Sequence, residues 1–112
     1  MVELELKKKV TRLDHVALNV SNIDNAASWY KENLGADVIY KDESWAMLKI
    51  GDSKIALTLA GEHPPHLGFS VEELSDIPSK NVSYHRDGSA YLYAIDLDGN
   101  VIEFVYYPPA SL

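Results

Sequence analysis

The sequence predicts an α+β fold built from two copies of one βαβββ module, and three observations support this. First, His15–Val20 and His66–Val71 share one pattern: histidine, large apolar, small, large apolar, small polar, valine. Second, apolar residues alternate with period two in both segments, as in strands with one buried face. Third, strand-like segments with turn signals follow each copy. We expect a single domain, 1–112, whose modules at about 12–60 and 66–107 pair into a cupped, mostly antiparallel sheet with the helices outside.

The first module continues from its opening strand into a helix. Ser21–Asp24 resembles a helix start, with an acidic residue three positions after the serine. Apolar residues at helical spacing follow through Leu34, and Gly35 is suited to end the helix as a C-cap residue. The remaining strands are expected at about 37–41, 45–50 and 54–59, with a hairpin turn at 51–52.

The second module has a reduced helical part. After its opening strand, only a short helix fits before Pro78. Strands are expected at about 91–96 and 101–106, and the Asp-Gly pair between them is a strong hairpin signal. A further strand is expected near 82–85. The two modules are joined by Gly61–Pro65, which two prolines stiffen.

Composition excludes several classes of protein. Of 112 residues, ten are Lys or Arg and seventeen are Asp or Glu, which gives a net charge of −7. This balance argues against nucleic acid, and the basic run Lys7–Lys9 is expected to be a solvated strand or tail. No apolar stretch approaches the roughly 20 residues that a membrane helix needs. With no cysteine and no export signal, we expect a cytoplasmic protein without disulfides or thiolate metal sites.

Strand parity places three potential metal ligands on one side. Residues two apart on a strand share a face, so His15, His66 and Glu103 lie opposite the residues that pack under the helices. A lone histidine or glutamate on a strand is more often a hydrogen-bonded structural residue, but here the two histidines occupy equivalent positions. The residues expected to pack are Val16, Leu18 and Val20, then Leu67, Phe69 and Val71, and on the last strand Ile102, Phe104 and Tyr106.

The repeat extends this argument to a fourth position. Laying Leu48–Thr58 over Ile95–Val105 puts Ala56 where the second module has Glu103. An approximate two-fold axis would then bring His15, Ala56, His66 and Glu103 together, with alanine leaving one place vacant. Two histidines and one carboxylate suit non-haem Fe(II), which we favour, although Mn, Co, Ni and Zn use similar donors.

By strand parity, five further side chains are expected on the same side of the sheet as the three candidate ligands, where they would line a cavity. Aromatic walls with a few polar tips are typical of small-molecule pockets, although such residues also serve as core or dimer packing. We expect the two tyrosines to be catalytic, because a phenol near a metal can donate a proton to bound substrate. His63 is interpreted as a linker residue, and His85 is given no role. The predicted substrate-binding residues are Trp45, Met47 and Lys49, and the predicted catalytic residues are Tyr91 and Tyr93.

These segments carry a family likeness. The chain resembles the vicinal oxygen chelate superfamily, which includes glyoxalase I, extradiol dioxygenases, fosfomycin-resistance transferases and bleomycin-binding proteins. The matching segments are Leu13–Val20, Ala27–Gly35, Pro65–Val71 and Asp96–Glu103. Each motif is loose by itself, but the four in this order make a specific match to the superfamily.

The resemblance implies a divalent metal held by His15, His66 and Glu103, which bind it while a substrate chelates it through vicinal oxygens. Ala56 stands where glyoxalase I would have a fourth ligand, so that activity is not expected. The resemblance leaves a dioxygenase, a lyase or isomerase, or a transferase as the expected enzyme class, acting on a small molecule and forming a homodimer. Two alternatives remain: a metal-free binding or sequestering protein of the bleomycin-resistance type, and an interaction domain that only inherits the fold.

Overall fold

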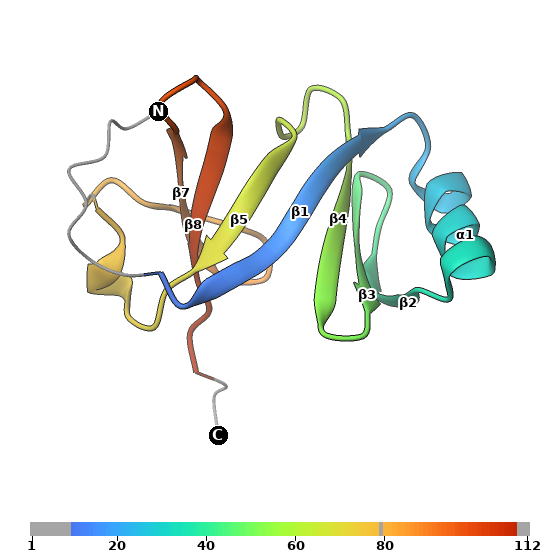
Figure 1. Cartoon of the computed structure of the whole chain (residues 1–112), viewed down its shortest axis with the longest axis horizontal. Coiled ribbons are helices and arrows are strands. Elements are labelled where there is room, and N and C mark those ends of the chain that lie inside the picture. The colour runs from blue at the N-terminus through green and yellow to red at the C-terminus, as the bar shows by residue number, and fades with distance from the viewer. Residues whose placement is uncertain (1–9, 79, 110–112) are drawn as a thin grey trace. The chain divides into compact units, whose positions relative to one another are not determined.

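The computed structural model describes residues 10–78 and 80–109, and Figure 1 shows their elements in chain order. They form two compact units: the first spans Asp14–His66, and the second holds the other described residues, from both ends of the chain. The basic run Lys7–Lys9 lies outside the described residues. No helix in the described ranges is long and apolar enough to span a membrane.

The first unit has the βαβββ order. Its sheet runs β2-β3-β4-β1, in which β1 and β4 are parallel and the other neighbours are antiparallel. The short turn at 51–52 joins β3 to β4 as a hairpin, with Ile50 opposite Ser53. The elements are β1 (Arg12–Val20), α1 (Ile23–Leu34), β2 (Asp37–Lys41), β3 (Trp45–Ile50) and β4 (Ser53–Leu59).

Local sequence signals set both ends of α1. The side chain of Asn22, rather than Ser21, caps the N-terminus and accepts a hydrogen bond of 2.8 Å from the Asn25 N–H. The expected cap at Ser21 is therefore displaced by one residue. Gly35 ends the helix in the left-handed conformation, with φ of 71°, as the sequence predicts.

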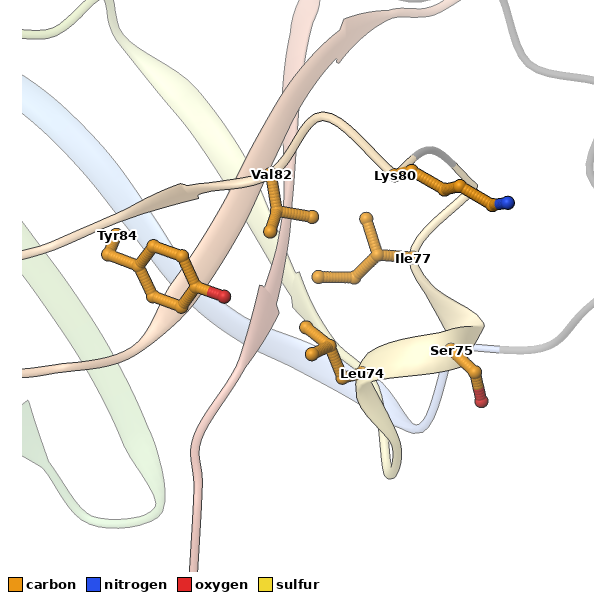
Figure 2. A pocket seen from close by; sticks show the side chains of 6 residues that line it. All are labelled: Leu74, Ser75, Ile77, Lys80, Val82 and Tyr84. Atoms are coloured by element: carbon orange, nitrogen blue, oxygen red, sulfur yellow. The ribbon is translucent and has the colours of Figure 1, made fainter.

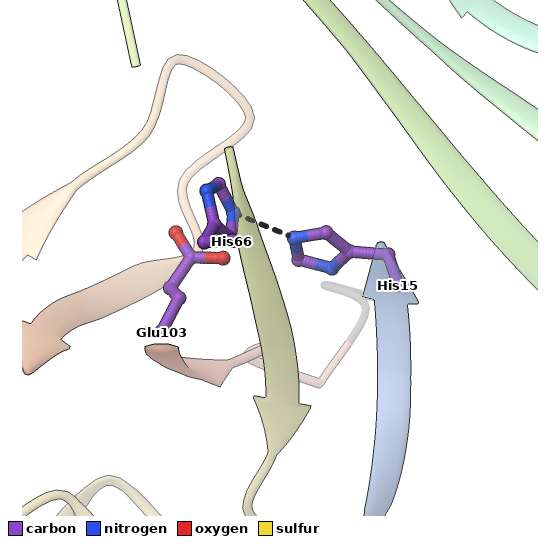
Figure 3. Close-up of side chains that lie close together, drawn as sticks. All are labelled: His15, His66 and Glu103. Carbon is purple, nitrogen blue, oxygen red and sulfur yellow. Dashed lines mark hydrogen bonds between the residues drawn. The ribbon is translucent and has the colours of Figure 1, made fainter. Parts of the chain in front are cut away.

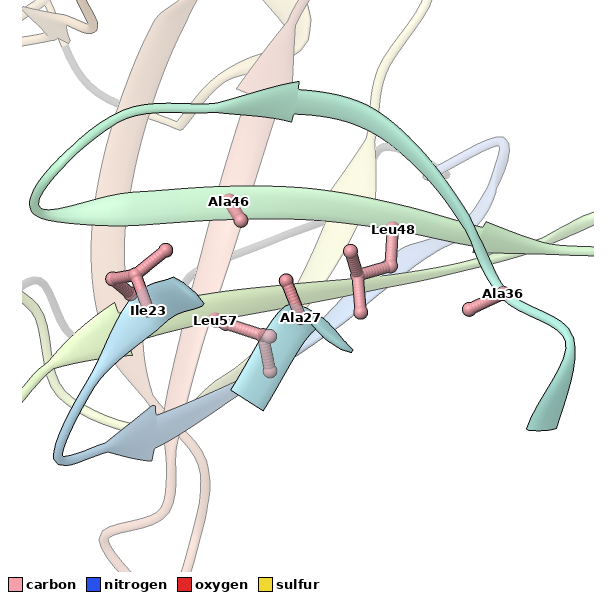
Figure 4. Packing of buried hydrophobic residues seen from close by; sticks show 6 residues of the cluster. All are labelled: Ile23, Ala27, Ala36, Ala46, Leu48 and Leu57. Carbon is pink, nitrogen blue, oxygen red and sulfur yellow. The ribbon is translucent and has the colours of Figure 1, made fainter. Parts of the chain in front are cut away.

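The core of the first unit lies between α1 and the sheet (Figure 4). Ala46 and Leu48 of β3 and Leu57 of β4 are fully buried, and α1 packs on this face of β2, β3 and β4. Small residues at Ala27 and Ala46 let the helix approach the sheet closely. The buried residues of this cluster are Ile23, Ala27, Ala36, Ala46, Leu48 and Leu57.

The second unit repeats the strand pattern with almost no helix. Its sheet runs β5-β8-β7-β6, with β5 and β8 parallel and the other neighbours antiparallel. A single 3₁₀ turn replaces the α-helix, in agreement with the short helix expected before Pro78. The elements are β5 (His66–Ser70), η1 (Leu74–Asp76), β6 (Ser83–Tyr84), β7 (Ala90–Ile95) and β8 (Val101–Tyr106).

The core of the second unit confirms the expected parity of β8. Phe104 is buried, and Ile102 and Tyr106 pack against the same cluster from alternate positions of β8. Glu103 therefore projects from the opposite face of this strand. The buried residues of this cluster are Val71, Ile77, Ala90, Leu92, Ala94 and Phe104.

Burial on β1 and β5 departs from the expected packing. On β5 the buried residues are His66, Gly68 and Ser70, while Leu67 is 42% exposed; on β1 Ala17 is buried and Leu18 is 36% exposed. The physical reason is the placement of the helices: α1 packs on β2, β3 and β4, while η1 is only one turn long. The α+β class, the βαβββ order and the mostly antiparallel pairing are confirmed.

The buried leucine of β4 offers a test of the first core. Leu57→Ala is expected to lower the free energy of unfolding by about 2–5 kcal/mol, because it removes apolar contacts and leaves a cavity. Leu97→Ala is the matched control, since Leu97 is 99% exposed and should change stability by less than ~0.5 kcal/mol. Urea denaturation followed by circular dichroism measures both, and equal losses would contradict this core.

Candidate metal centre

The first unit brings the two predicted histidines into contact. His15 lies on β1 and His66 is the first residue of β5, and their side chains are 6% and 8% exposed. The two Nε2 atoms are 3.2 Å apart, as the dashed line in Figure 3 marks. The rings meet edge to face, with an interplanar angle of 83°. Two imidazoles buried in this geometry present their nitrogens to one small space between them.

The Nδ1 atom of each ring lies within hydrogen-bond distance of an oxygen that can accept a hydrogen bond but cannot donate one. His15 Nδ1 lies 2.7 Å from Oδ2 of Asp14, and His66 Nδ1 lies 2.7 Å from the backbone carbonyl oxygen of Pro64. Each Nδ1 must therefore carry the proton and donate it. In the neutral rings, both Nε2 atoms are then left with a lone pair, which is the form that binds metal.

Two lone pairs facing each other at 3.2 Å repel unless a positive charge is shared between them. A proton on one Nε2 would meet this requirement by making that ring an imidazolium. A divalent metal ion meets it without charging either ring, and ligating histidines commonly donate their second N–H to a carboxylate or a backbone carbonyl. The donor chemistry of this pair therefore fits a metal ion.

The residues around Asp14 were missed by the sequence analysis. Asp14 is 4% exposed, and its Oδ1 lies 3.0 Å from the ammonium of Lys54 on β4. The same carboxylate thus serves a lysine with one oxygen and His15 with the other. The adjacency of Asp14 and His15 in the sequence was a weak signal, but nothing in the pattern pointed to Lys54.

Glu103 lies in the second unit, where it is buried and has a polar side chain as its neighbour. Its side chain is 2% exposed, and His85 Nε2 lies 2.8 Å from Oε2. The ring of His85 stacks on Tyr91, with centroids 3.7 Å apart. His85, which was assigned no role, is therefore the partner that orients this carboxylate. The sequence did not indicate this role, because His85 lies in a polar, loop-like stretch without a periodic pattern.

The two predicted catalytic tyrosines lie on β7, which pairs with β8, the strand that carries Glu103. Tyr93 is the direct antiparallel partner of Glu103, and the rings of Tyr91 and Tyr93 lie 5.4 Å apart. Burial, with smaller contributions from the charge of Glu103 and from Tyr91, raises the pKa of Tyr93 well above its usual range. Tyr93 is therefore a neutral phenol, which can donate a proton or hydrogen bond at ordinary pH.

The strand registers support the expected equivalence of Ala56 and Glu103. Ala56 pairs with Ala17, two residues after His15, and Glu103 pairs with Gly68, two residues after His66. The overlay does not hold for the strands before the turns. Met47 is the partner of Ala56 and Tyr93 is the partner of Glu103, so Met47 corresponds to Tyr93. The connection between the paired residues is one residue longer in the second module, and this shifts the alignment of β3 with β7 by one position.

The predicted substrate-binding residues all lie on β3, alternating with the core residues Ala46 and Leu48. Their side chains therefore leave the face of the sheet opposite to α1. Trp45 contacts Tyr40, with ring centroids 4.5 Å apart, while Lys49 is exposed. The β3 set is Trp45, Met47 and Lys49.

A hollow in the second unit lies elsewhere. It lies between η1 and β6 (Figure 2), and its volume is about 670 Å³. Ile77 belongs to the core of the second unit and Val82 packs against it, on the face where Phe104 lies. Glu103 leaves the opposite face of β8, so this hollow is separate from Glu103. The lining residues are Leu74, Ser75, Ile77, Lys80, Val82 and Tyr84.

Comparison with known proteins gives consistent similarities. The family model described as the glyoxalase/bleomycin resistance protein/dioxygenase superfamily matches residues 12–78. No curated protein matches the sequence. Methylmalonyl-CoA epimerase from Mycobacterium tuberculosis superposes with a TM-score of 0.75 at 21% identity, covering 97% of this chain and 94% of that one.

Two further solved structures have similar folds. A methylmalonyl-CoA epimerase variant from Streptomyces coelicolor, in complex with 2-nitronate-propionyl-CoA, superposes with a TM-score of 0.71 at 20% identity, covering 88% of this chain and 98% of that one. A hypothetical protein from Bacillus halodurans gives a TM-score of 0.70 at 19% identity, with coverages of 90% and 97%. At these identities the similarity shows a shared fold.

The raised pKa of Tyr93 predicts an alkaline loss of stability. Above roughly pH 10 the unfolded chain releases the Tyr93 proton while the folded chain keeps it, so the free energy of unfolding should fall as the pH rises. Tyr93→Phe should make this fall shallower between about pH 9.5 and 11. Tyr84→Phe is the control, because Tyr84 is 65% exposed. Identical slopes for wild type and Tyr93→Phe would contradict the burial of this phenol.

Proposed function

Because this chain belongs to the glyoxalase/bleomycin resistance protein/dioxygenase superfamily, we propose that it is a metal-dependent enzyme acting on a small molecule through two neighbouring oxygen atoms. The observation that carries this proposal is the pair of buried Nε2 atoms of His15 and His66, 3.2 Å apart. Their Nδ1 atoms are both engaged by acceptors, so the pair is prepared for a shared cation.

We propose Glu103 as the third ligand. His15, His66 and Glu103 are all buried, and each offers one ligand atom. The pairing of β5 with β8 supports this choice: His66 begins β5, and Glu103 is the partner of Gly68, two residues further along. Residues two apart share a strand face, so the carboxylate is expected on the side where His66 points. Ala56 provides no donor at the equivalent position, which leaves coordination positions for substrate.

The proposed metal is a divalent ion, with Fe(II) favoured and Mn, Co, Ni or Zn using the same donors. When bound, such an ion supplies a Lewis acid that polarises chelated oxygens, or a redox centre if it is iron. The protein supplies the rest: Asp14 and the Pro64 carbonyl hold the histidines, and His85 holds the carboxylate.

We assign the proton-donating role to Tyr93. Its phenol stays protonated because burial raises its pKa, and it sits beside Glu103 on the neighbouring strand. Such a group can donate a hydrogen bond to a substrate oxygen as negative charge develops there. Tyr91, in contact with Tyr93, is proposed to assist, and Trp45, Met47 and Lys49 are proposed to contact the substrate.

An isomerase acting on a small acyl-CoA or a related carboxylate is the first activity to assay. The similar folds include methylmalonyl-CoA epimerases crystallised with methylmalonyl-CoA and with 2-nitronate-propionyl-CoA, and a protonated phenol suits proton transfer next to a chelated carbonyl. Oxygen-dependent cleavage of catechols is the second assay if the metal is iron. A homodimer remains a prediction from the family resemblance.

Metal content tests the proposal directly. Protein purified without air or chelator is expected to contain about one transition metal ion per chain, because a 2-His-1-carboxylate set is a complete facial ligand group. The double variant His15→Ala/Glu103→Ala should lose it, while His63→Ala, which removes a histidine of the linker, should retain it. Elemental analysis measures all three. If the wild type takes up no Fe, Mn, Ni or Zn even on reconstitution, a metal-free binding protein replaces the enzyme.

The proposed vacancy at Ala56 can be tested by adding a metal ligand there. Ala56→Glu should tighten metal binding by roughly tenfold or more, because it adds a charged oxygen donor where Glu103 has its counterpart. The same variant should lose activity, since one substrate position is closed. Competition with a chromophoric chelator measures the affinity, and circular dichroism checks folding. A folded variant with wild-type affinity would contradict a shared site for Ala56 and Glu103.

A further inference from the structure

We propose that Asp14 and Lys54 act together as positioning residues that decide which nitrogen of His15 is free to bind a ligand. The consequence for metal affinity rests on the proposed function, whereas the effect on the His15 ring belongs to the protein alone. Neither residue contacts a substrate in this proposal. Both act through His15.

Among the described residues, each oxygen of the Asp14 carboxylate lies close to a basic side chain. Oδ2 lies 2.7 Å from His15 Nδ1, and Oδ1 lies 3.0 Å from Lys54 Nζ. The side chain of Asp14 is 0% exposed and that of Lys54 is 25% exposed. A buried carboxylate needs a nearby cation, and Lys54 provides it while leaving the second oxygen for the histidine.

Strand pairing brings these residues together. β1 and β4 are parallel, and Val16 is the partner of Ile55. Extending this register back by one residue places Lys54 beside His15, at the start of β4. The lysine is therefore delivered to Asp14 by the main-chain ladder of the first unit rather than by a flexible loop.

The two histidines are positioned by different means. His66 donates to the backbone carbonyl of Pro64, which is part of a Pro-Pro segment and does not depend on any side chain. His15 donates to a side chain that is itself held by another side chain. Substitutions at Asp14 or Lys54 should therefore change His15 and leave His66 as an internal reference.

The key variant is Asp14→Asn. An asparagine has one oxygen instead of two, and both Lys54 Nζ and His15 Nδ1 need an acceptor. The charged lysine takes the oxygen, since charge-assisted hydrogen bonds are the stronger ones, and the amide N–H then faces His15 Nδ1. His15 is forced into the tautomer with its proton on Nε2. The protonated Nε2 atom can no longer bind a metal ion.

The double variant Asp14→Asn/Lys54→Met should reverse this effect. Without the lysine, the amide oxygen is released and can turn to accept from His15 Nδ1, so the original tautomer returns. Rescue by a second substitution is a result that a merely structural role for Lys54 would not produce.

Long-range proton–nitrogen NMR on metal-free protein is the primary test, at about pH 8.5, where free imidazole is neutral. Wild type should show a proton on Nδ1 of both His15 and His66. Asp14→Asn should move the His15 proton to Nε2, and the double variant should restore it, with His66 unchanged throughout. A His15 proton that stays on Nδ1 in Asp14→Asn, or fails to return in the double variant, would overturn the proposal.

Metal titration of the same variants separates this inference from the proposed function. Asp14→Asn should bind Zn²⁺ or Co²⁺ roughly 10–100-fold more weakly than wild type, and the double variant should recover part of the loss. Tautomers that follow the prediction in a protein that binds no metal would uphold the positioning role and reject the metal function. Metal binding that is normal in Asp14→Asn would reject the positioning role.

Lys54→Met by itself provides a second measurement if Asp14→Asn does not fold. It should retain the proton on Nδ1 of His15, because the carboxylate still accepts it, and should lose more stability than Lys41→Met. Lys41 is the matched control, since it pairs with Asp24 at 2.7 Å but at an exposed place, with Asp24 77% exposed. Equal losses of stability, or a displaced His15 proton, would count against the assignment.

Discussion

The facing pair of Nε2 atoms on His15 and His66 is the constraint on which the candidate centre depends. Each ring donates its only neutral-state proton away from the other ring, one to Asp14 and one to the Pro64 carbonyl. In the neutral rings two Nε2 lone pairs then face each other. A proton shared between the two rings or a metal ion relieves their repulsion, and a metal ion does so with ordinary ligand chemistry.

The supports of the centre differ in kind. His66 depends on the backbone, through a stiff Pro-Pro segment, and His15 depends on a chain of two side chains, Asp14 and Lys54. Glu103 is held in turn by His85, whose ring is stacked on Tyr91. Each proposed ligand thus has a dedicated partner that orients it. Such outer partners determine ligand geometry and basicity as much as the ligands themselves do.

The strand ladders place these groups by simple repetition. In each unit a parallel pair joins the first strand of the module to its last strand, Ala17 to Ala56 in one and Gly68 to Glu103 in the other. The same ladder position therefore holds an alanine in one module and a glutamate in the other. This difference makes the proposed site asymmetric, with donors from both modules but a vacancy in only one. Family membership and fold similarity are compatible with many chemistries, so the proposed metal-dependent chemistry depends on this asymmetry and on the neutral phenol of Tyr93.

Period-two alternation and turn signals in the sequence were sufficient to predict the βαβββ order, the C-cap at Gly35 and the short second helix, because all of these depend on local backbone preferences. The same alternation predicted the strand faces of His15, His66 and Glu103. It misjudged Leu18 and Leu67, because parity reports which face a residue takes and not whether a helix covers that face.

The partners of the ligands were decided only by the tertiary structure. Lys54 reaches Asp14 through the pairing of two strands that are 40 residues apart at these positions, 54 − 14, and His85 reaches Glu103 from a short strand end with no periodic pattern. Sequence alone determined the strands, their faces and the candidate ligands, since these follow from neighbours along the chain. The hydrogen-bond partner of each ligand, and therefore the nitrogen that each histidine leaves free, depends on atoms that meet only when distant strands pair.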